Sequence, residues 1–229
     1  NTDDTEIARG LLNKAIELDD NLISAKVLLG TTYMEMGDYD EAMDIYTTTL
    51  KQAEELSDKA GMGASLGNIG IVHKIKGNYD TALEYYDRSI KIKEEIGDKL
   101  GMGKSLNNIG NVHANKGDYD KALDYYGRSL TIQEEIGNKD GMGLSLINIG
   151  IVHANKGDYD KALDYYGRSL TICEELGNKS GMGQSLNNIG AVHANKGDYD
   201  KALDYYGRAL AIQEELGDKR GMGYSLTNI

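Results

Sequence analysis

Residues 117–156 read GDYDKALDYYGRSLTIQEEIGNKDGMGLSLINIGIVHANK, and residues 157–196 repeat them with few changes. Residues 77–116 repeat the same block with more changes, and the period extends loosely back to Gly37 and forward to the end of the chain. Self-similarity at this period is typical of stacked repeats, in which each unit buries its apolar face only against its neighbours. The sequence therefore predicts a repeat protein.

Each block resolves into two amphipathic helices. In the first helix, residues at 4-3-4 spacing lie on one face: Met102, Leu106, Ile109 and His113. The second helix carries a similar stripe: Tyr119, Ala122, Leu123, Tyr126 and Leu130. Between the two, Gly117 permits a left-handed helix end and Asp118 can cap the following helix. Gly137 and Asn138 are stop and start signals after the second helix. Links this short make neighbouring helices antiparallel.

Small residues recur in the middle of these helices. They are Gly110, Gly150 and Gly190 on the first helices, and Ala122, Ala162 and Ala202 on the facing second helices. A glycine inside a helix costs about 1 kcal/mol relative to alanine. Its recurrence at one register therefore predicts that two helices approach closely there.

These residues resemble the tetratricopeptide repeat family. The matching positions are Leu106, Ile109-Gly110, His113, Ala122, Tyr126 and Ser129, together with the turn Gly117-Asp118-Tyr119. Two features depart from the common pattern: no Pro follows the second helix, and the period is forty residues instead of about 34. In its longer second helix the chain is more similar to kinesin light chains and cell-polarity adaptors. The resemblance implies an all-α fold, a right-handed α-solenoid of antiparallel helix pairs.

The repeat lays out the whole chain as one solenoid domain, residues 1–229. We expect a partial helix at 4–18, helix pairs at 21–56, 59–96, 99–136, 139–176 and 179–216, and a clipped helix at 219–229. Because the chain starts without Met and stops partway through a repeat, we also expect it to be a piece of a longer protein.

Charge and composition exclude several classes of partner. The formal net charge of −12 disfavours nucleic acid and anionic membrane surfaces, both of which attract Lys and Arg. No apolar run approaches the ~18 residues of a membrane span, and nothing resembles a signal peptide. We therefore expect a soluble, cytoplasmic protein. The single Cys173 excludes a disulfide within the chain.

Two rows of residues, with one member in each repeat, could suggest a chemical role, but their positions indicate packing in the core. The four histidines share one register at the centre of the apolar stripe: His73, His113, His153 and His193. A zinc site needs donors about 2 Å from one ion, whereas packed helices stand about 8–10 Å apart. Packing is therefore the main interpretation, and a metal or pH-sensing role is the alternative. The methionines Met62, Met102, Met142, Met182 and Met222 share that stripe, which favours core packing over a hydrophobic groove.

No catalytic motif is present. The sequence contains no P-loop, no nucleophile elbow and no HExxH. We expect a protein that is not an enzyme and that has no cofactor and no metal.

The opposite face of the first helix is unusual in composition. It carries Lys104, Asn108, Asn111 and Asn115, whereas the second helices carry Asp, Glu, Lys and Arg. Asn is a poorer helix former than Glu or Lys, so an Asn-rich face costs helical stability. This cost suggests that the face has a specific use.

One register on this face is Asn in every repeat: Asn68, Asn108, Asn148, Asn188 and Asn228. A side-chain amide both donates and accepts hydrogen bonds, so it can pair with the backbone of an extended peptide. The row resembles the asparagine ladder of kinesin light chains and polarity adaptors, which implies binding of extended peptide segments in a concave groove. The alternative is that these amides bond to one another between adjacent first helices and fix the superhelix.

Neighbouring registers vary between repeats and are expected to select the ligand. The first is Ala64, Lys104, Leu144, Gln184 and Tyr224, the second is Ile71, Asn111, Ile151 and Ala191, and the third is Gly67, Asn107, Ile147 and Asn187. Asn115, Asn155 and Asn195 extend the same face. The family's clamp for C-terminal carboxylates needs several cations, and only Lys104 and Lys74 are candidates here, so that ligand is not predicted.

The sequence thus predicts a non-catalytic scaffold that binds a protein or peptide segment in an Asn-lined groove. Two alternatives remain. The chain is a structural repeat array that self-associates by end-to-end stacking, or it is the sensor arm of a larger signalling protein.

Overall fold

The computed structural model describes residues 2–228, with side chains from residue 5 onward. Within that range the chain forms twelve α-helices and no strand, and it divides into two compact units after Val112. Their bounds are α1 (Thr2–Leu18), α2 (Ile23–Met36), α3 (Tyr39–Glu55), α4 (Lys59–Ile75), α5 (Tyr79–Glu95), α6 (Lys99–Asn115), α7 (Tyr119–Glu135), α8 (Lys139–Asn155), α9 (Tyr159–Leu176), α10 (Lys179–Asn195), α11 (Tyr199–Leu216) and α12 (Lys219–Asn228).

The expected all-α class is confirmed, and the helices lie within about two residues of the predicted ranges. Residue 229, the end of the predicted last helix, lies outside the described residues. That the chain is one domain stays a prediction. No helix in residues 2–228 is both long enough and apolar enough to span a bilayer.

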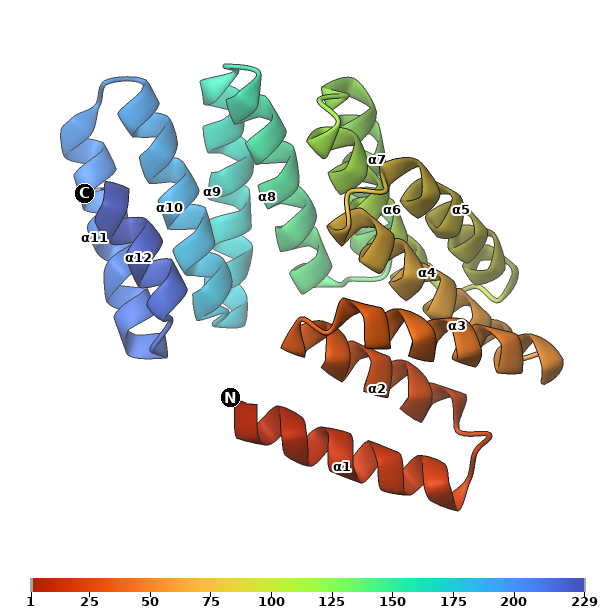
Figure 1. The fold of residues 1–229 in the computed structure, drawn as a ribbon. Helices are drawn as coiled ribbons and strands as arrows, with labels where there is room; N and C mark the ends of the chain where they lie inside the picture. Colours follow the sequence, from red (N-terminus) through yellow and green to blue (C-terminus); the bar gives the residue numbers. More distant parts are fainter. Residues whose placement is uncertain (1, 229) are drawn as a thin grey trace. The chain divides into compact units, whose positions relative to one another are not determined.

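Within each unit, consecutive helices run antiparallel and pack side by side (Figure 1). We call α2, α4, α6, α8, α10 and α12 the first helices, and α3, α5, α7, α9 and α11 the second helices. In residues 113–228, α8 packs on α10 and α10 packs on α12, whereas α9 and α11 do not meet. The same holds in residues 5–112, where α2 packs on α4 while α3 and α5 stay apart. The first helices therefore form the inner layer of each unit.

The predicted stripes form the core. In the first unit, Tyr46, Leu66 and Ile69 are 1–2% exposed and pack with Ala42, Leu50 and Val72. In the second unit, equivalent clusters form around Tyr126 and Tyr166. Burial of these stripes supplies the main stabilisation, since an isolated helix pair could not cover its own apolar face.

The mid-helix glycines explain how closely the paired helices approach. A Cβ atom added to Gly70 would lie 2.7 Å from the ring of Tyr86, and one added to Gly190 would lie 2.8 Å from the ring of Tyr206. Close packing at this register is confirmed. The nearest atoms belong to the tyrosine ring of the second helix, however, and not to the alanines that the sequence suggested.

The two kinds of junction are capped differently. After each second helix, the residue before the next first helix caps it: Asn138 accepts a hydrogen bond from the Gly141 N–H at 3.3 Å, and Asp98 accepts one from the Gly101 N–H at 2.8 Å. The prediction that Asp118 caps the following helix is wrong, because its side chain makes no bond to that helix. Its Oδ2 instead lies 3.4 Å from Nδ1 of His113.

The histidines pack as stacks on the second helices. The His153 ring lies parallel to the Tyr165 ring at 5.5 Å, and Arg168 covers the same tyrosine. His113 and His193 repeat this arrangement, each next to an aspartate. His73 differs because Asn78 replaces the aspartate, and its buried Nδ1 has no hydrogen-bond partner in the described structure.

Candidate functional site

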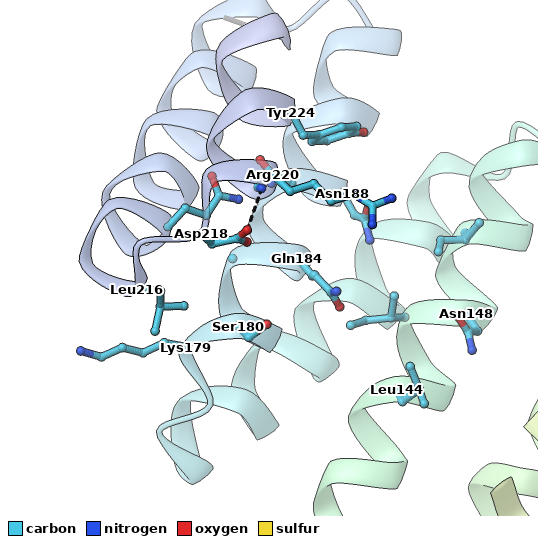
Figure 2. Close-up of a pocket in the computed structure, with 16 residues that line it drawn as sticks. Leu144, Asn148, Lys179, Ser180, Gln184, Asn188, Leu216, Asp218, Arg220 and Tyr224 are labelled. Carbon is cyan, nitrogen blue, oxygen red and sulfur yellow. Dashed lines mark hydrogen bonds between the residues drawn. The ribbon is translucent and has the colours of Figure 1, made fainter. Parts of the chain in front are cut away.

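The inner face of the second unit contains a pocket of about 580 Å³ (Figure 2). It lies among the first helices α8, α10 and α12 and the end of α11. Seven predicted groove residues line it: Leu144, Ile147, Asn148, Ile151, Gln184, Asn187 and Asn188. The predicted face is therefore hollowed where α8, α10 and α12 meet.

The apolar side chains of the pocket lie on α8. Leu144 and Ile151 are 52% and 38% exposed, so their aliphatic surface is open to a ligand in the pocket. Asn148 lies between them on the same helix face, since it follows Leu144 by one turn. This wall can therefore offer apolar contact to a ligand.

The polar side chains of the pocket lie mainly on α10 and α12. Gln184 and Asn188 are one turn apart on α10, and Figure 2 shows them near Tyr224 of α12. Asn188 is half-buried, and its amide has no hydrogen-bond partner anywhere in residues 5–228. A half-buried amide with free donors and acceptors is a ready partner for a peptide group.

The other residues of the asparagine register differ in their partners. Asn68 and Asn108 lie half-buried in the first unit, and Asn148 interacts with another residue of the chain. Asn228 is exposed, and its Nδ2 donates to the Tyr224 carbonyl oxygen at 2.7 Å, within its own helix. Asn188 therefore carries the free amide in the pocket.

Bracing between adjacent first helices involves a neighbouring register. Ser225 of α12 donates a hydrogen bond to Oδ1 of Asn187 on α10 at 2.9 Å. Oγ of Ser225 also lies 2.7 Å from Oε1 of Gln213 on α11, so the single hydroxyl proton has one acceptor on α10 and another on α11. Asn187, of a neighbouring register, thus links α10 to α12, and bracing by the register of Asn188 stays an alternative.

The register of Asn187 is also less open than expected. Asn107, Ile147 and Asn187 are only 5%, 7% and 6% exposed. Ile147 and Asn187 still reach the pocket, as its floor. These residues can shape the pocket but can offer little surface to a ligand.

The remaining predicted groove residues lie outside this pocket. Lys104 is exposed and Asn111 half-buried on the part of α6 that belongs to the first unit. Asn115, Asn155 and Asn195 are exposed at the last positions of α6, α8 and α10. The structure does not bring these three to the residues around Asn188.

Eight lining residues were not among the predicted groove residues: Lys179, Ser180, Gly183, Gln213, Leu216, Asp218, Arg220 and Gly221. Tyr224 also lines the pocket, and it belongs to the variable register that was expected to select the ligand. Ser180 and Arg220 precede Gln184 and Tyr224 by one helical turn, so the repeat alignment could have found them. Leu216 and Asp218 lie where α11 ends and α12 begins, away from that face, and only the fold brings them there.

The charges around the pocket are mostly paired. Lys179 forms an ion pair with Glu215, and Oδ1 of Asp218 accepts a hydrogen bond from the Gly221 N–H at 3.0 Å, the dashed line in Figure 2. Arg220 has no carboxylate partner among residues 5–228. The pocket therefore combines amides and aliphatic surface with one free cation.

No group of three metal-binding side chains gathers in the part of the chain that the structure describes. Cys173 is buried on α9, and burial raises the pKa of its thiol. Because the thiolate is the reactive form, this environment disfavours a nucleophilic role.

Models of the tetratricopeptide repeat match residues 21–95, 101–175 and 183–216. The chain belongs to the tetratricopeptide repeat family. A search of curated proteins gave no match.

Solved structures of other proteins share this fold. BtubC (BKLC) from P. vanneervenii is 21% identical with a TM-score of 0.76, and the match covers 93% of this chain and 90% of that one. Aspartyl phosphate phosphatase F from Bacillus subtilis is 17% identical with a TM-score of 0.78, over 93% of this chain and 58% of that one. A Rap protein complexed with competence and sporulation factor is 18% identical with a TM-score of 0.79, over 94% and 62%. The chain thus spans about three fifths of the last two proteins.

Proposed function

We propose that this chain is a non-catalytic interaction module that binds an extended peptide segment of a partner protein in the pocket of its second unit. The observation that carries this proposal is the free, half-buried amide of Asn188 opposite the exposed aliphatic side chains of Leu144 and Ile151. An amide can hold a peptide group of the ligand through both its donor and its acceptor. The aliphatic wall then selects an apolar side chain of the ligand.

Two further observations support the proposal. The pocket volume of about 580 Å³ suits a few residues of an extended chain. Among the proteins that share the fold, one is a Rap protein whose structure was solved in complex with competence and sporulation factor. From this structure we infer only that the fold can present a binding surface.

The proposal includes no nucleic acid, no membrane, no metal and no cofactor. A net charge of −12 repels phosphate backbones and anionic headgroups. It also includes no catalysis, because the pocket contains no nucleophile next to a general base. Self-association by end-to-end stacking is the alternative, and sedimentation velocity over a range of concentrations distinguishes it.

A peptide-display selection against the protein tests the proposal. We expect enriched peptides that share an apolar position, and we expect Asn188→Ala and Leu144→Ser to weaken their binding by at least about tenfold, the effect of losing one good polar or apolar contact. Asn195→Ala is the matched control, because Asn195 is an exposed asparagine of the same helix outside the pocket. A selection without enrichment, or equal binding by Asn188→Ala and the wild type, would refute the proposal.

A further inference from the structure

The first unit contains a pocket of its own, with a volume of about 340 Å³ and walls from α1, α2 and α3. Its apolar lining comes from all three helices: Leu29 of α2 is buried, and Ile16 of α1 and Ile45 of α3 are half-buried. Within residues 5–112, α1 and α3 each pack on α2 but not on each other. The pocket therefore lies where α1 and α3 leave part of α2 uncovered.

Later repeats carry larger side chains at two of the registers that line this pocket. Ile45 corresponds to Tyr85, Tyr125, Tyr165 and Tyr205, and Thr48 corresponds to Arg88, Arg128, Arg168 and Arg208. Tyr165 packs against the core cluster around Tyr126 of the preceding repeat, and Arg168 covers its ring at 5.4 Å. The exchange of this tyrosine and arginine for Ile45 and Thr48 explains why the first unit has open space here.

The same exchange leaves an aspartate without its arginine. In later repeats this arginine forms an ion pair with the carboxylate one helical turn before it, as Arg128 does with Asp124 at 3.7 Å. Asp44, the equivalent of Asp124, lines the pocket and is followed one turn later by Thr48. It has no cationic partner among residues 5–112. The pocket thus lacks the guanidinium that its own aspartate has in other repeats.

A second carboxylate lines the pocket on the same helix. Glu41 precedes Asp44 by three residues, which places both on one face of α3. Most later repeats have a cation at the register of Glu41: Lys121, Lys161 and Lys201. Glu41 has no cationic partner in the described part of the first unit. Two neighbouring registers are therefore more acidic here than in the other repeats.

The nearby cations do not neutralise these two carboxylates. Lys26 lines the pocket, but its Nζ lies 2.6 Å from Oδ1 of Asp20 and donates to Oε1 of Gln52 at 2.6 Å. Arg9 of α1 lies over the ring of Tyr33 and is outside the lining. The lining, as far as the structure describes it, thus has two unpaired carboxylates and no unpaired cation.

We propose that this pocket binds the side chain of an arginine that a partner protein presents. The site belongs to the first unit and does not depend on the peptide pocket proposed for the second. The guanidinium replaces the arginine that α3 lacks, and its five donors in a planar fork can serve Asp44 and Glu41 together. The methylene stem of the arginine packs on Leu29 and Ile45. A chain with a net charge of −12 also attracts a cationic partner.

Titration of the whole protein with the capped tripeptide acetyl-Gly-Arg-Gly-amide, followed by NMR of methyl groups, tests the site. The methyl signals of Leu29, Ile45 and Thr48 should shift saturably. The same tripeptide with citrulline, which has nearly the shape of arginine but no charge, should leave them unchanged, and the lysine tripeptide should bind more weakly. Equal shifts with the citrulline and arginine peptides would refute the site. Equal affinity for the lysine and arginine peptides would overturn the choice of a guanidinium.

Two variants at exposed positions of α3 locate the binding. Thr48→Arg introduces the residue of the later repeats, which should pair with Asp44 and occupy the pocket itself. Asp44→Asn removes one carboxylate. We expect each variant to bind the arginine peptide at least about tenfold more weakly, the effect of losing one charge-assisted hydrogen bond.

Glu54→Gln is the matched control for both variants. Glu54 is exposed on α3 outside the pocket, and its exchange changes the net charge by the same single unit. This variant should bind the arginine peptide as the wild type does. Unchanged binding by Thr48→Arg would overturn the placement of the ligand in this pocket. A loss in Glu54→Gln as large as in Asp44→Asn would also overturn it, because overall charge would then explain the effect.

Discussion

A Cβ atom on Gly150 would lie 2.6 Å from Cε1 of Tyr166, closer than real side chains approach one another. Tyr166 is 2% exposed and packs with Ala162, Ile189 and Val192, so its ring has no space to retreat. The glycine of the first helix and the tyrosine of the second therefore set the distance between the two helices of a repeat.

We predict that Gly150→Ala destabilises the protein, although alanine is the better helix former. Helix propensity alone would add about 1 kcal/mol. The clash with Tyr166 should cost about 1–3 kcal/mol, as overpacking of a core does, so the expected net loss is up to about 2 kcal/mol. The free energy of unfolding from urea titrations measures the difference.

Gly127→Ala in α7 is the matched control. Gly127 is also inside a helix, but an added Cβ atom there meets nothing within 4 Å. This variant should gain up to about 1 kcal/mol of stability. If both variants change stability in the same direction, the tyrosine contact is not what requires the glycine.

We predict that Ser57→Gly stabilises the first unit. Ser57 has a φ of 58°, the left-handed conformation, whereas the corresponding junctions of later repeats use glycines such as Gly97. A residue with a Cβ atom pays roughly 1–2 kcal/mol there. Glycine removes this strain but loses about 0.5–1 kcal/mol of chain entropy, so a net gain of up to about 1 kcal/mol is expected.

The reverse exchange checks the same argument. Gly97→Ser should lower the free energy of unfolding by a similar amount, because Gly97 has a φ of 70°. Thermal unfolding monitored by circular dichroism compares the two variants. A Ser57→Gly variant with a lower melting temperature than the wild type would contradict the prediction.

We predict that Asn188→Ala leaves the protein as stable as the wild type or slightly more stable. Its amide has no partner within residues 5–228, so removing it breaks no bond, and alanine is the better helix former by up to about 0.7 kcal/mol. Asn187→Ala should instead lower stability by up to about 1 kcal/mol, because it removes one of the two acceptors of the Ser225 hydroxyl and with it the link between α10 and α12. Urea titrations of both variants test this, and a large loss in Asn188→Ala would favour a bracing role for the ladder.

We predict that Asn78→Asp raises the pKa of His73. Burial lowers that pKa from its ordinary value of 6.5, and the Lys76 ammonium lowers it further. A carboxylate at position 78 would lie as Asp158 does, with Oδ2 3.3 Å from the histidine Nδ1, and would favour the imidazolium. An NMR titration of the His73 ring reports the pKa directly, and Asn78→Ala should leave it unchanged.

The lowered pKa of His73 also makes the stability of the protein depend on pH. Because the folded state favours the neutral ring, the unfolded chain binds more protons as the pH falls below about 6.5. His73 therefore contributes no destabilisation above that pH, and stability falls as the pH drops from 6.5 toward the folded pKa. His73→Tyr, which introduces the residue of Tyr33, should reduce this loss at low pH relative to the wild type.

Sequence patterns predicted most of the fold because each helix repeats one face. Leu106 and Ile109 repeat at fixed spacing, and so do the turn glycines, so helix ends and buried stripes could be assigned without the structure. The role of Asp118 could not. An aspartate before a helix has two competing partners, the helix backbone and a polar side chain nearby, and only the fold shows that His113 lies in reach.

The candidate site was predictable to the extent that it lies on one helical face. Leu144, Asn148 and Asn188 follow from the register of the first helices. Leu216 does not, because it lies at the end of α11, a second helix, which carries a different face pattern.

The left-handed glycines that close the helices have one more consequence. The residue after each of these glycines donates its backbone N–H to the carbonyl oxygen five positions earlier. Asn138, after Gly137, donates to Gln133, and Asn178, after Gly177, donates to Cys173. The hydrogen bonds of each joint, the turn between a second helix and the next first helix, thus lie within about six consecutive residues. Deleting or duplicating the forty residues between two such joints would rebuild the same joint. A gene of this kind can lengthen or shorten its product by whole repeats in a single recombination event, without a new loop having to evolve.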